Sequence, residues 1–415
     1  MPFQRQRNVI HCLVPVVFAM LCSCGSGPST SGSIQANGMV GGGTNLARAM
    51  FRATAVSAIR QPVTTVKMGL ATLWHRPREV FRGNLPLDPT VQEAIAETPG
   101  TPEFEALLDR RKFPRAAAGS LKWLVDGPGF FNEFDRQIAT ATSSIHLQVF
   151  IFDNDDVAVR YAGLLKERAK DVKVRVLFDD LGSTFAATAA PETLGPAGVV
   201  PPDDMADYLE RKSKVSARRI LNPWLTCDHT KLLVFDRRTA ILGGMNIGRE
   251  YYSEWHDLMV KVEGPVVEQL AREFNRAWRK AGPWGDFGLF RQPEILRRPD
   301  PVKDGIPLRL LRTDPAEGRH EILDATLLAI RGAKKRVWIE NPYFANDDIA
   351  LACEAAARRG VDVRVILPGR GDSTIMDAGN LSTASDLIQA GAKVYRYPGM
   401  THMKVMVCDD WACMG

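Results

Sequence analysis

The sequence predicts an α/β protein: a duplicated α/β/α sandwich whose two pseudo-symmetric halves share one active site. Residues 143–156 (SSIHLQVFIFDNDD) align with residues 335–348 (KRVWIENPYFANDD), and residues 172–180 (VKVRVLFDD) with residues 361–369 (VDVRVILPG). Helix-like segments lie between the members of each half, at residues 157–170 and 349–360. Alternation of strand and helix predicts a buried, largely parallel sheet in each half.

Size and composition allow two or three domains but identify no partner. The chain has 415 residues, 45% of them apolar and 24% charged, which is ordinary for globular proteins. A net charge of +5 from 53 basic and 48 acidic residues is compatible with an anionic substrate without indicating one. The seven cysteines form no Cys-x-x-Cys pair, so neither a disulfide framework nor a structural zinc site is expected.

The N-terminus predicts export. Arg5 and Arg7 precede an apolar run at residues 9–21, which is too short to span a bilayer and is interrupted by Pro15. These features are typical of a secretory signal peptide, which we place at residues 1–23.

The end of this segment resembles the lipobox of bacterial lipoproteins, in which Cys24 would be acylated and become the first mature residue. Cys22 stands where a small residue other than cysteine is usual, so an ordinary signal or an uncleaved anchor is the alternative. Residues 24–45 are rich in Gly and Ser and would form a flexible tether. We therefore expect an exported lipoprotein, anchored in the bacterial cell envelope on the periplasmic side.

Residues 46–118 are expected to form a basic, partly helical N-terminal region. Met50, Phe51, Val56 and Ile59 could share one face of a helix. We expect that face to pack on the catalytic body, because core-facing amphipathic helices are far commoner than interfacial ones. The alternative is a helix that lies on an anionic membrane surface.

Two similar stretches carry the chemistry: HTKLLVFD at residues 229–236 and HMKVMVCD at residues 402–409. Side chains two residues apart in a strand point to the same face, so each stretch presents imidazole and ammonium side by side. Core packing explains this poorly, because an unpaired buried Lys is costly. Cys227 and Cys408 lie nearby, but a Lys within each stretch opposes a metal ion. The two stretches are interpreted as two halves of one site.

Further polar residues follow the first stretch. A tight turn and a second strand end in Gly243, Gly244 and, two residues on, Asn246. Glycine lets the backbone approach a phosphate closely, and the Asn246 amide can donate to an anionic oxygen. Asp257 precedes an expected strand at residues 258–262 and is the nearest expected partner for His229. An amphipathic helix is expected at residues 265–281.

These motifs resemble those of the phospholipase D superfamily, whose signature is His-x-Lys, four residues, Asp, and then Gly-Gly or Gly-Ser, one residue and Asn, present twice. The resemblance runs from Leu121 to Gly415. It is fullest to bacterial cardiolipin synthases and related lipid phosphodiesterases, through HTKLLVFDRRTAILGGMNIG and WHDLMVKVEGPVVEQL. The two halves would occupy residues 119–292 and 308–415, joined by a linker at residues 293–307.

The resemblance implies cleavage of a phosphodiester through a phosphohistidine. His229 would be the nucleophile and His402 the acid and base, although the pseudo-symmetry also allows the reverse assignment. The phosphoryl oxygens would be held by Lys231, Lys404 and Asn246, with the backbone at Gly244, so no metal or other cofactor is expected. Asp257 would orient His229. Asp236 and Asp409 would bond loop amides of their own halves.

The substrate class implied is phospholipid, with water or a lipid alcohol such as phosphatidylglycerol as the acceptor. Phospholipid and the membrane surface are the expected partners, and no nucleic acid is expected. A secreted nuclease and a catalytically inactive, membrane-tethered fragment are the alternatives. After His402 only thirteen residues follow, so the second motif lacks the Ser and Asn of its Gly-Ser-x-Asn segment. This predicts a truncated second half and a 415-residue chain that is inactive or poorly folded by itself.

Overall fold

The structure, a computed structural model, describes residues 45–82, 89–189, 193, 195–221, 223–290, 302 and 305–415. The predicted signal peptide, the lipidation site Cys24 and all of the Gly/Ser tether except residue 45 lie outside the described residues. So does most of the expected linker at residues 293–307.

The first half is built on one eight-stranded sheet, in the order β4-β3-β2-β5-β6-β7-β1-β8. Its strands are β1 (Ala117–Val125), β2 (Ser144–Val149), β3 (Lys173–Asp179), β4 (Ser216–Ile220), β5 (Leu232–Phe235), β6 (Thr239–Gly243), β7 (Leu258–Glu263) and β8 (Ile306–Leu308). Only β2, β3 and β4 are parallel neighbours, and every other pair is antiparallel.

The second half repeats the β4-β3-β2-β5-β6 part of this arrangement in a five-stranded sheet, in the order β13-β12-β11-β14-β15. Its strands are β11 (Arg336–Glu340), β12 (Asp362–Pro368), β13 (Lys393–Tyr397), β14 (Val405–Cys408) and β15 (Trp411–Met414). The first three are parallel and the last two antiparallel. The expectation of largely parallel sheets was therefore wrong. Helical crossovers join β2, β3 and β4, and β11, β12 and β13, into parallel sets, whereas tight turns join β5 to β6 and β14 to β15, which forces antiparallel pairing.

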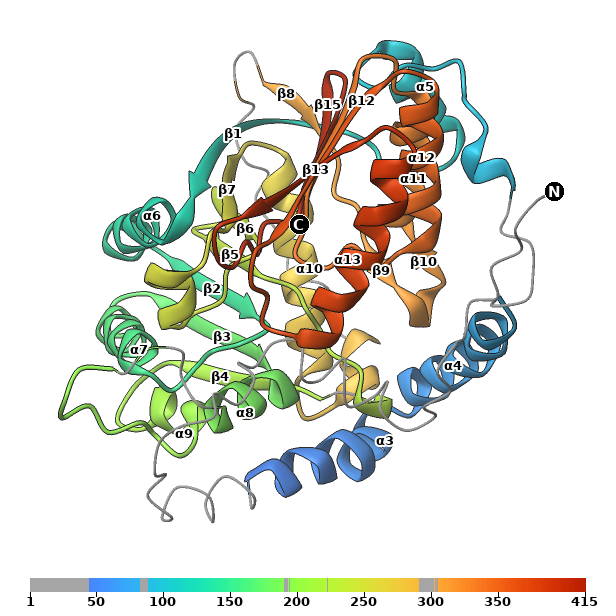
Figure 1. Cartoon of the computed structure of the whole chain (residues 1–415). Helices are drawn as coiled ribbons and strands as arrows, with labels where there is room; N and C mark the ends of the chain where they lie inside the picture. The colour runs from blue at the N-terminus through green and yellow to red at the C-terminus, as the bar shows by residue number, and fades with distance from the viewer. Residues whose placement is uncertain are drawn as a thin grey trace.

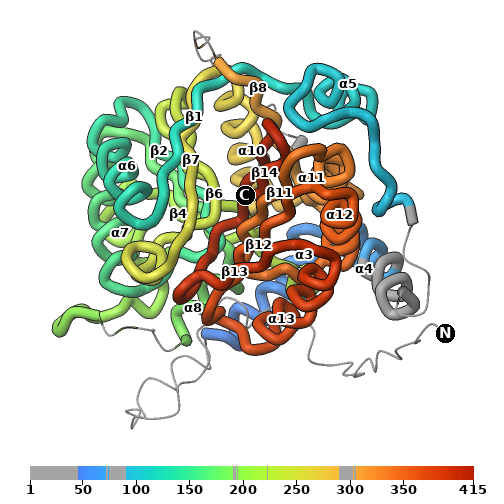
Figure 2. The backbone as a smooth tube through the Cα atoms, turned by 45° about the horizontal axis from the view of Figure 1, so that its top comes forward, coloured from blue at the N-terminus to red at the C-terminus, as the bar shows by residue number. Residues whose placement is uncertain are grey.

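Helices cover both faces of the first sheet. α6 (Asp126–Thr140) and α7 (Asp156–Arg168) bury a cluster of Phe and Tyr side chains on one face. On the other face lies α10 (Val266–Lys280), whose apolar side packs on β5, β6 and β7. Figure 2 shows α10 between the two sheets, and its cluster extends to Met414 of β15. The expected helix at residues 265–281 is thus part of the contact between the halves.

The second half has α11 (Glu321–Gly332), α12 (Asp347–Arg358) and α13 (Thr374–Gln389). The remaining elements are short: α5 (Pro102–Arg110), α8 (Asp180–Thr188), α9 (Met205–Glu210), η2 (Pro89–Gln92), η3 (Pro223–Leu225), η4 (Glu250–Glu254), η5 (Gly285–Phe290), η6 (Pro315–Glu317), β9 (Thr313–Asp314) and β10 (Arg319–His320). Phe104 and Leu108 of α5 join the core of the second half. The expected N-terminal region is therefore divided in space, because its last helix completes the C-terminal core.

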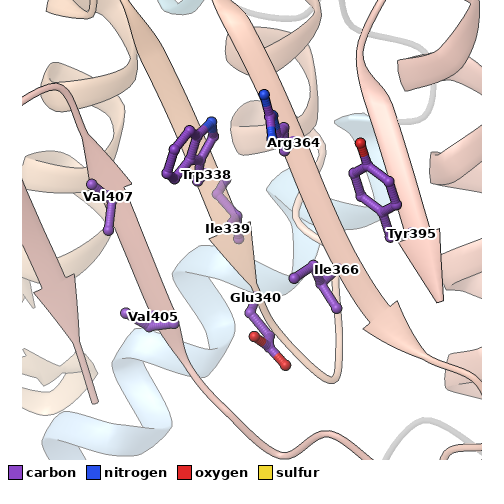
Figure 3. Close-up of a pocket in the computed structure, with 8 residues that line it drawn as sticks. All are labelled: Trp338, Ile339, Glu340, Arg364, Ile366, Tyr395, Val405 and Val407. Atoms are coloured by element: carbon purple, nitrogen blue, oxygen red, sulfur yellow. The ribbon is translucent and has the colours of Figure 1, made fainter. Parts of the chain in front are cut away.

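Helices α11 and α12 pack on one face of the second sheet. Along its opposite face the described residues leave a hollow of about 420 Å³. Figure 3 shows the side chains that line it: Trp338, Ile339, Glu340, Arg364, Ile366, Tyr395, Val405 and Val407. In the first half α10 covers the equivalent face, where His146, the repeat counterpart of Trp338, stacks on Phe274 at 4.8 Å. The two halves thus differ in what covers this face.

The N-terminal helices wrap around the outside of the body. Residues 45–60 are helical with a π-turn, η1 (Arg52–Val56), followed by α3 (Ser57–Arg60), and α4 (Pro62–Arg82) continues them. Phe51 and Ile59 are exposed, at 63% and 79%. The expectation that this apolar face packs on the catalytic body was wrong, because polar and small residues make those contacts instead. No helix within the described ranges combines the length and apolarity needed to cross a membrane.

Candidate active site

Each His-x-Lys segment lies in extended chain immediately before a strand, not within it as expected. His229 and Lys231 precede β5, and His402 and Lys404 precede β14. Because β5 and β14 pair antiparallel with β2 and β11, both segments reach the edge where those parallel strands end. Each half therefore delivers its imidazole and ammonium to the carboxyl edge of its parallel strands, where α/β proteins commonly place their sites.

The motif carboxylates fix these segments from a distance. Asp236 accepts hydrogen bonds from the backbone amides of Thr142, Ser143 and Ser144 at 2.7–2.9 Å. Asp409 accepts the equivalent bonds from the amides of residues 334–336, at 2.8–3.0 Å. Both aspartates have positive φ, 52° and 49°, at the turn after the strand. The bonds tie each motif strand to the start of the neighbouring parallel strand, away from the histidines.

A loop of the first half pairs directly with the second motif. The His256 amide donates to the carbonyl of Met400 at 3.1 Å, and the His402 amide donates to the carbonyl of His256 at 2.7 Å. His256 and Thr401 form an isolated parallel bridge between them. This backbone pairing fixes the two halves relative to each other within two residues of an expected catalytic group.

The same loop brings a carboxylate to His402. Nδ1 of His402 lies 2.7 Å from Oδ2 of Asp257, and both side chains are buried, at 1% and 0% exposure. The expectation that Asp257 partners His229 was therefore wrong: the loop crosses the seam and orients the histidine of the other half. A carboxylate on Nδ1 holds the proton there and leaves Nε2 for chemistry.

The two lysines lie against their own histidines. Nζ of Lys231 is 3.0 Å from Nδ1 of His229, and Nζ of Lys404 is 2.9 Å from Nε2 of His402. Each ammonium also donates to the carbonyl of its histidine at 2.9 Å. Lys231 is buried and lies over the ring of Phe150, at 5.1 Å from its centroid. Two cations held beside two imidazoles create a positive site that suits an anionic ligand.

Both histidines are held in their neutral form. His229 is exposed, yet desolvation by its neighbours and the charges of Lys231 and Lys404 lower its pKa well below the usual value. Burial and the charge of Lys404 lower the pKa of His402 to about 4, whereas the charge of Asp257 acts in the opposite direction. His402 is thus the imidazole whose protonated form has a carboxylate to stabilise it.

Asn246 and Gly244 follow β6, and Gly244 lies against Asp257. Oδ1 of Asn246 accepts from the Ile151 amide at 2.9 Å, while its Nδ2 is buried with no hydrogen-bond partner among the described residues. A Cβ on Gly244 would lie 2.1 Å from Oδ1 of Asp257. Gly244 therefore admits the Asp257 carboxylate; the expectation that it leaves backbone open to phosphate was wrong.

Sequence reasoning missed the aromatic and carboxylate groups around the histidines. The ring of His402 contacts Trp255 at 5.2 Å, and the ring of His229 contacts Phe150 at 4.5 Å. His256 donates through Nδ1 to Oδ1 of Asp126 at 2.7 Å, and its ring stacks on Tyr397 at 4.5 Å. Only the adjacency of Trp255 and His256 to Asp257 could have indicated them.

Within the described ranges, no three His, Cys, Asp or Glu side chains gather in the manner of a metal-ion site. Of the expected site residues, the two imidazoles, the two ammonium groups and the Asp257 carboxylate interact with one another at the seam. This set of groups can bind an anion and move a proton.

A duplicated α/β sandwich with one His-x-Lys segment from each half at the seam defines a phospholipase D-type protein. Residues 134–278 and 327–415 match the family described as "Cardiolipin synthase, PLD-like domain". The chain belongs to this family and is an enzyme of the phospholipase D superfamily.

Curated relatives agree with this assignment. Cardiolipin synthase A of Pseudomonas putida (strain W619) is 31% identical over 343 residues, which span 80% of this chain and 68% of the relative. Cardiolipin synthase A of Pseudomonas aeruginosa (strain LESB58) is 31% identical over 353 residues, 81% of this chain and 69% of the relative. The solved phosphatidylserine synthase of Haemophilus influenzae Rd KW20 has a similar fold, with a TM-score of 0.52 at 13% identity over 74% of this chain and 81% of that one.

Proposed function

We propose that this protein transfers or hydrolyses the phosphatidyl group of phospholipids, as a cardiolipin synthase or phospholipase D does, through a phosphohistidine. One observation carries the proposal: Asp257 of the first half bonds His402 of the second, at a seam that also holds His229 and two lysines. The similarity to cardiolipin synthases supplies the substrate class.

His229 is the proposed nucleophile. Its neutral imidazole attacks phosphorus through a ring nitrogen, forming an N–P bond as the bond to the leaving alkoxide breaks. His402 gives that alkoxide a proton, because Asp257 stabilises the imidazolium. In the second step His402 takes a proton from the acceptor hydroxyl, whose oxygen attacks phosphorus and releases His229. An anionic diester beside both histidines raises their pKa, which allows His402 to be protonated at the first step.

The remaining groups would stabilise charge on the phosphoryl oxygens. Lys231 and Lys404 supply ammonium donors, and the buried Nδ2 of Asn246 supplies a neutral one. Preorganised donors of this kind stabilise developing charge without having to reorganise during the reaction.

We further propose that the enzyme works at the bacterial cell envelope. The apolar run at residues 9–21 and Cys24 support export and lipid attachment on the periplasmic side, which would hold the cleft beside its phospholipid substrate. The acceptor, water or a lipid alcohol, depends on which of them reaches the cleft.

Phospholipid turnover and DNA cleavage by the protein and its His229→Ala variant test the proposal. Loss of lipid turnover on substitution supports it, loss of DNA cleavage alone supports a nuclease, and no activity before substitution supports an inactive scaffold. His320→Ala, on β10 rather than in the motifs, is the matched control and should keep full turnover.

The intermediate has its own test. Protein quenched in alkali after reaction with head-group-cleavable, phosphate-labelled lipid should retain label, because N–P bonds survive base. His229→Ala should retain none, whereas His402→Ala should retain label at a reduced rate of formation. The opposite pattern would reverse the roles of the two histidines.

A further inference from the structure

We propose that the N-terminal helices carry a docking surface for a phospholipid bilayer. This apolar stripe consists of Ile59, Val63, Val66, Leu70 and Leu73. The proposal extends the proposed function, since it names the surface by which the enzyme would reach a lipid substrate.

The stripe faces outward along its whole length. Its side chains are 79%, 51%, 61%, 61% and 71% exposed, in chain order. Val63, Val66, Leu70 and Leu73 follow one another at three or four residues and so lie on one side of α4. Ile59 precedes them on α3, before the non-helical Gln61. Single exposed aliphatic residues need no explanation, but a continuous exposed row of five marks an interaction surface.

Polar contacts on the opposite side fix this orientation. Arg52 forms a salt bridge with Asp180 at 2.6 Å. Thr64 donates to Asp286 through its hydroxyl at 2.6 Å and its amide at 2.8 Å. Lys67, at the flank, lies 3.1 Å from Glu317. The helices are therefore inverted relative to ordinary amphipathic helices: polar groups hold them to the body and apolar groups face away.

Exposed aromatic side chains at η3 and η5, which both contact α4, lie next to this surface. Trp224, Trp284 and Phe287 are 59%, 66% and 56% exposed. Trp224 donates through its indole to the Thr65 carbonyl at 2.8 Å. Gly285, next to Trp284, packs so closely that a Cβ there would lie 1.6 Å from the Arg60 carbonyl oxygen. Tryptophan with one apolar and one polar side is the residue favoured at membrane–water interfaces.

The surface is joined to the catalytic edge of the first half. Asp180, the anchor of Arg52, follows Asp179, whose Oδ2 accepts the Asp228 amide at 2.8 Å. His229 is the next residue. Figure 1 shows the helix that ends in α3 at the lower edge of the molecule, and α4, also in blue, rising along its right side. A bilayer on the stripe would therefore lie on the side of the molecule where Asp179 bonds the loop that carries His229.

A bilayer fits this surface better than a second copy of the chain. Exposed Trp224 and Trp284 lie beside the stripe, and tryptophan gathers at membrane–water interfaces. Basic Arg48 is exposed on the same helical segment, as favoured beside anionic head groups. The sequence before residue 45 also carries the apolar run of residues 9–21, which the proposed function already directs to the membrane.

Oxidative footprinting of the full-length chain tests the surface without needing turnover. Vesicles of phosphatidylethanolamine and phosphatidylglycerol should slow oxidation of Leu70, Trp284 and Phe287 by about fivefold or more. Trp123 of β1 and Ile306 of β8, which are 49% and 50% exposed, should change less than about twofold. Unchanged oxidation of the stripe on vesicle-bound protein would overturn the proposal. Slower oxidation of the stripe at higher protein concentration, without vesicles, would also overturn the proposal, because a second copy of the chain would then cover the stripe.

Paired substitutions give a second measurement. Val66→Gln with Leu70→Gln should weaken vesicle binding by about tenfold or more, with an unchanged melting temperature, because these side chains are exposed in the free protein. Trp123→Gln with Ile306→Gln is the matched control. Equal binding by both double variants would overturn the docking surface. The parent protein could also bind vesicles without turning over any phospholipid, while Val66→Gln with Leu70→Gln loses that binding. This result would support the docking surface and contradict the proposed function.

Discussion

Asp257→Asn is the sharpest test of the site, because it changes one buried carboxylate into an isosteric amide. The hydrogen bond that Oδ1 of Asp257 accepts from the Leu258 amide, at 2.7 Å, can remain with asparagine. The free energy of unfolding should therefore change by no more than about 1–2 kcal/mol. The bond to Nδ1 of His402 loses its acceptor, and the imidazole can take the wrong tautomer. By comparison with other carboxylate-oriented histidines, kcat should fall about 10³- to 10⁴-fold, or about 4–5.5 kcal/mol.

Two assays separate this effect from a general structural loss. Steady-state turnover should show the fall in kcat with little change in KM. A histidine titration followed by NMR should show the pKa of His402 moving further below its value of about 4, because Asp257 raises it in the parent protein.

Asp126→Asn is the matched control. It removes the carboxylate that bonds His256, the residue before Asp257, and leaves the pair of Asp257 and His402 intact. It should keep turnover within about threefold. Retention of more than about a tenth of turnover by Asp257→Asn, or an equal loss in both variants, would refute the assigned role.

Three further predictions follow from the geometry. Asp236→Asn should lower the free energy of unfolding by about 1–2 kcal/mol at pH 7, measured by urea denaturation. Partial burial raises the pKa of Asp236, but hydrogen bonds from the loop amides outweigh it and lower this pKa to about 2. The stabilisation that the Asp236 carboxylate gives to the fold is therefore complete above about pH 4 and is lost as the pH falls toward 2. The difference in the free energy of unfolding between parent and variant should shrink over the same pH range. The value of kcat/KM should rise as the pH falls from 8 to about 6, because His402 must carry a proton to act as the acid of the first step and its pKa in the free protein is about 4. The alkaline limb of kcat should lie at higher pH than that of kcat/KM, because the bound diester raises the pKa of His402; coincident limbs would contradict this. Gly244→Ala should displace Asp257, lowering stability by about 1–3 kcal/mol and turnover by about as much as Asp257→Asn, whereas Gly163→Ala on α7, where a Cβ meets nothing within 4 Å, should leave turnover unchanged.

The sequence by itself determined the repeat, the βαβ segments and the chemistry. The internal repeat correctly identified β2 and β3 as the counterparts of β11 and β12, because strand periodicity and helix-like segments are local properties of the chain. The spacing of His229 and Lys231, and of their second copies, was sufficient to indicate an anion site. The strand-end aspartates were expected to bond loop amides, and the structure shows such bonds in both halves.

Contacts between distant segments could be decided only by the tertiary structure. Asp257 lies closer in sequence to His229 than to His402, yet it bonds His402, because the loop that carries it pairs with the backbone of the other half. Gly244 accommodates that carboxylate, a role that glycine alone does not indicate. The apolar row of the N-terminal helices is also ambiguous in sequence, since a helix with one apolar side can turn that side inward or outward. Its direction depends on Asp180, Asp286 and other partners far along the chain, which a local pattern cannot include.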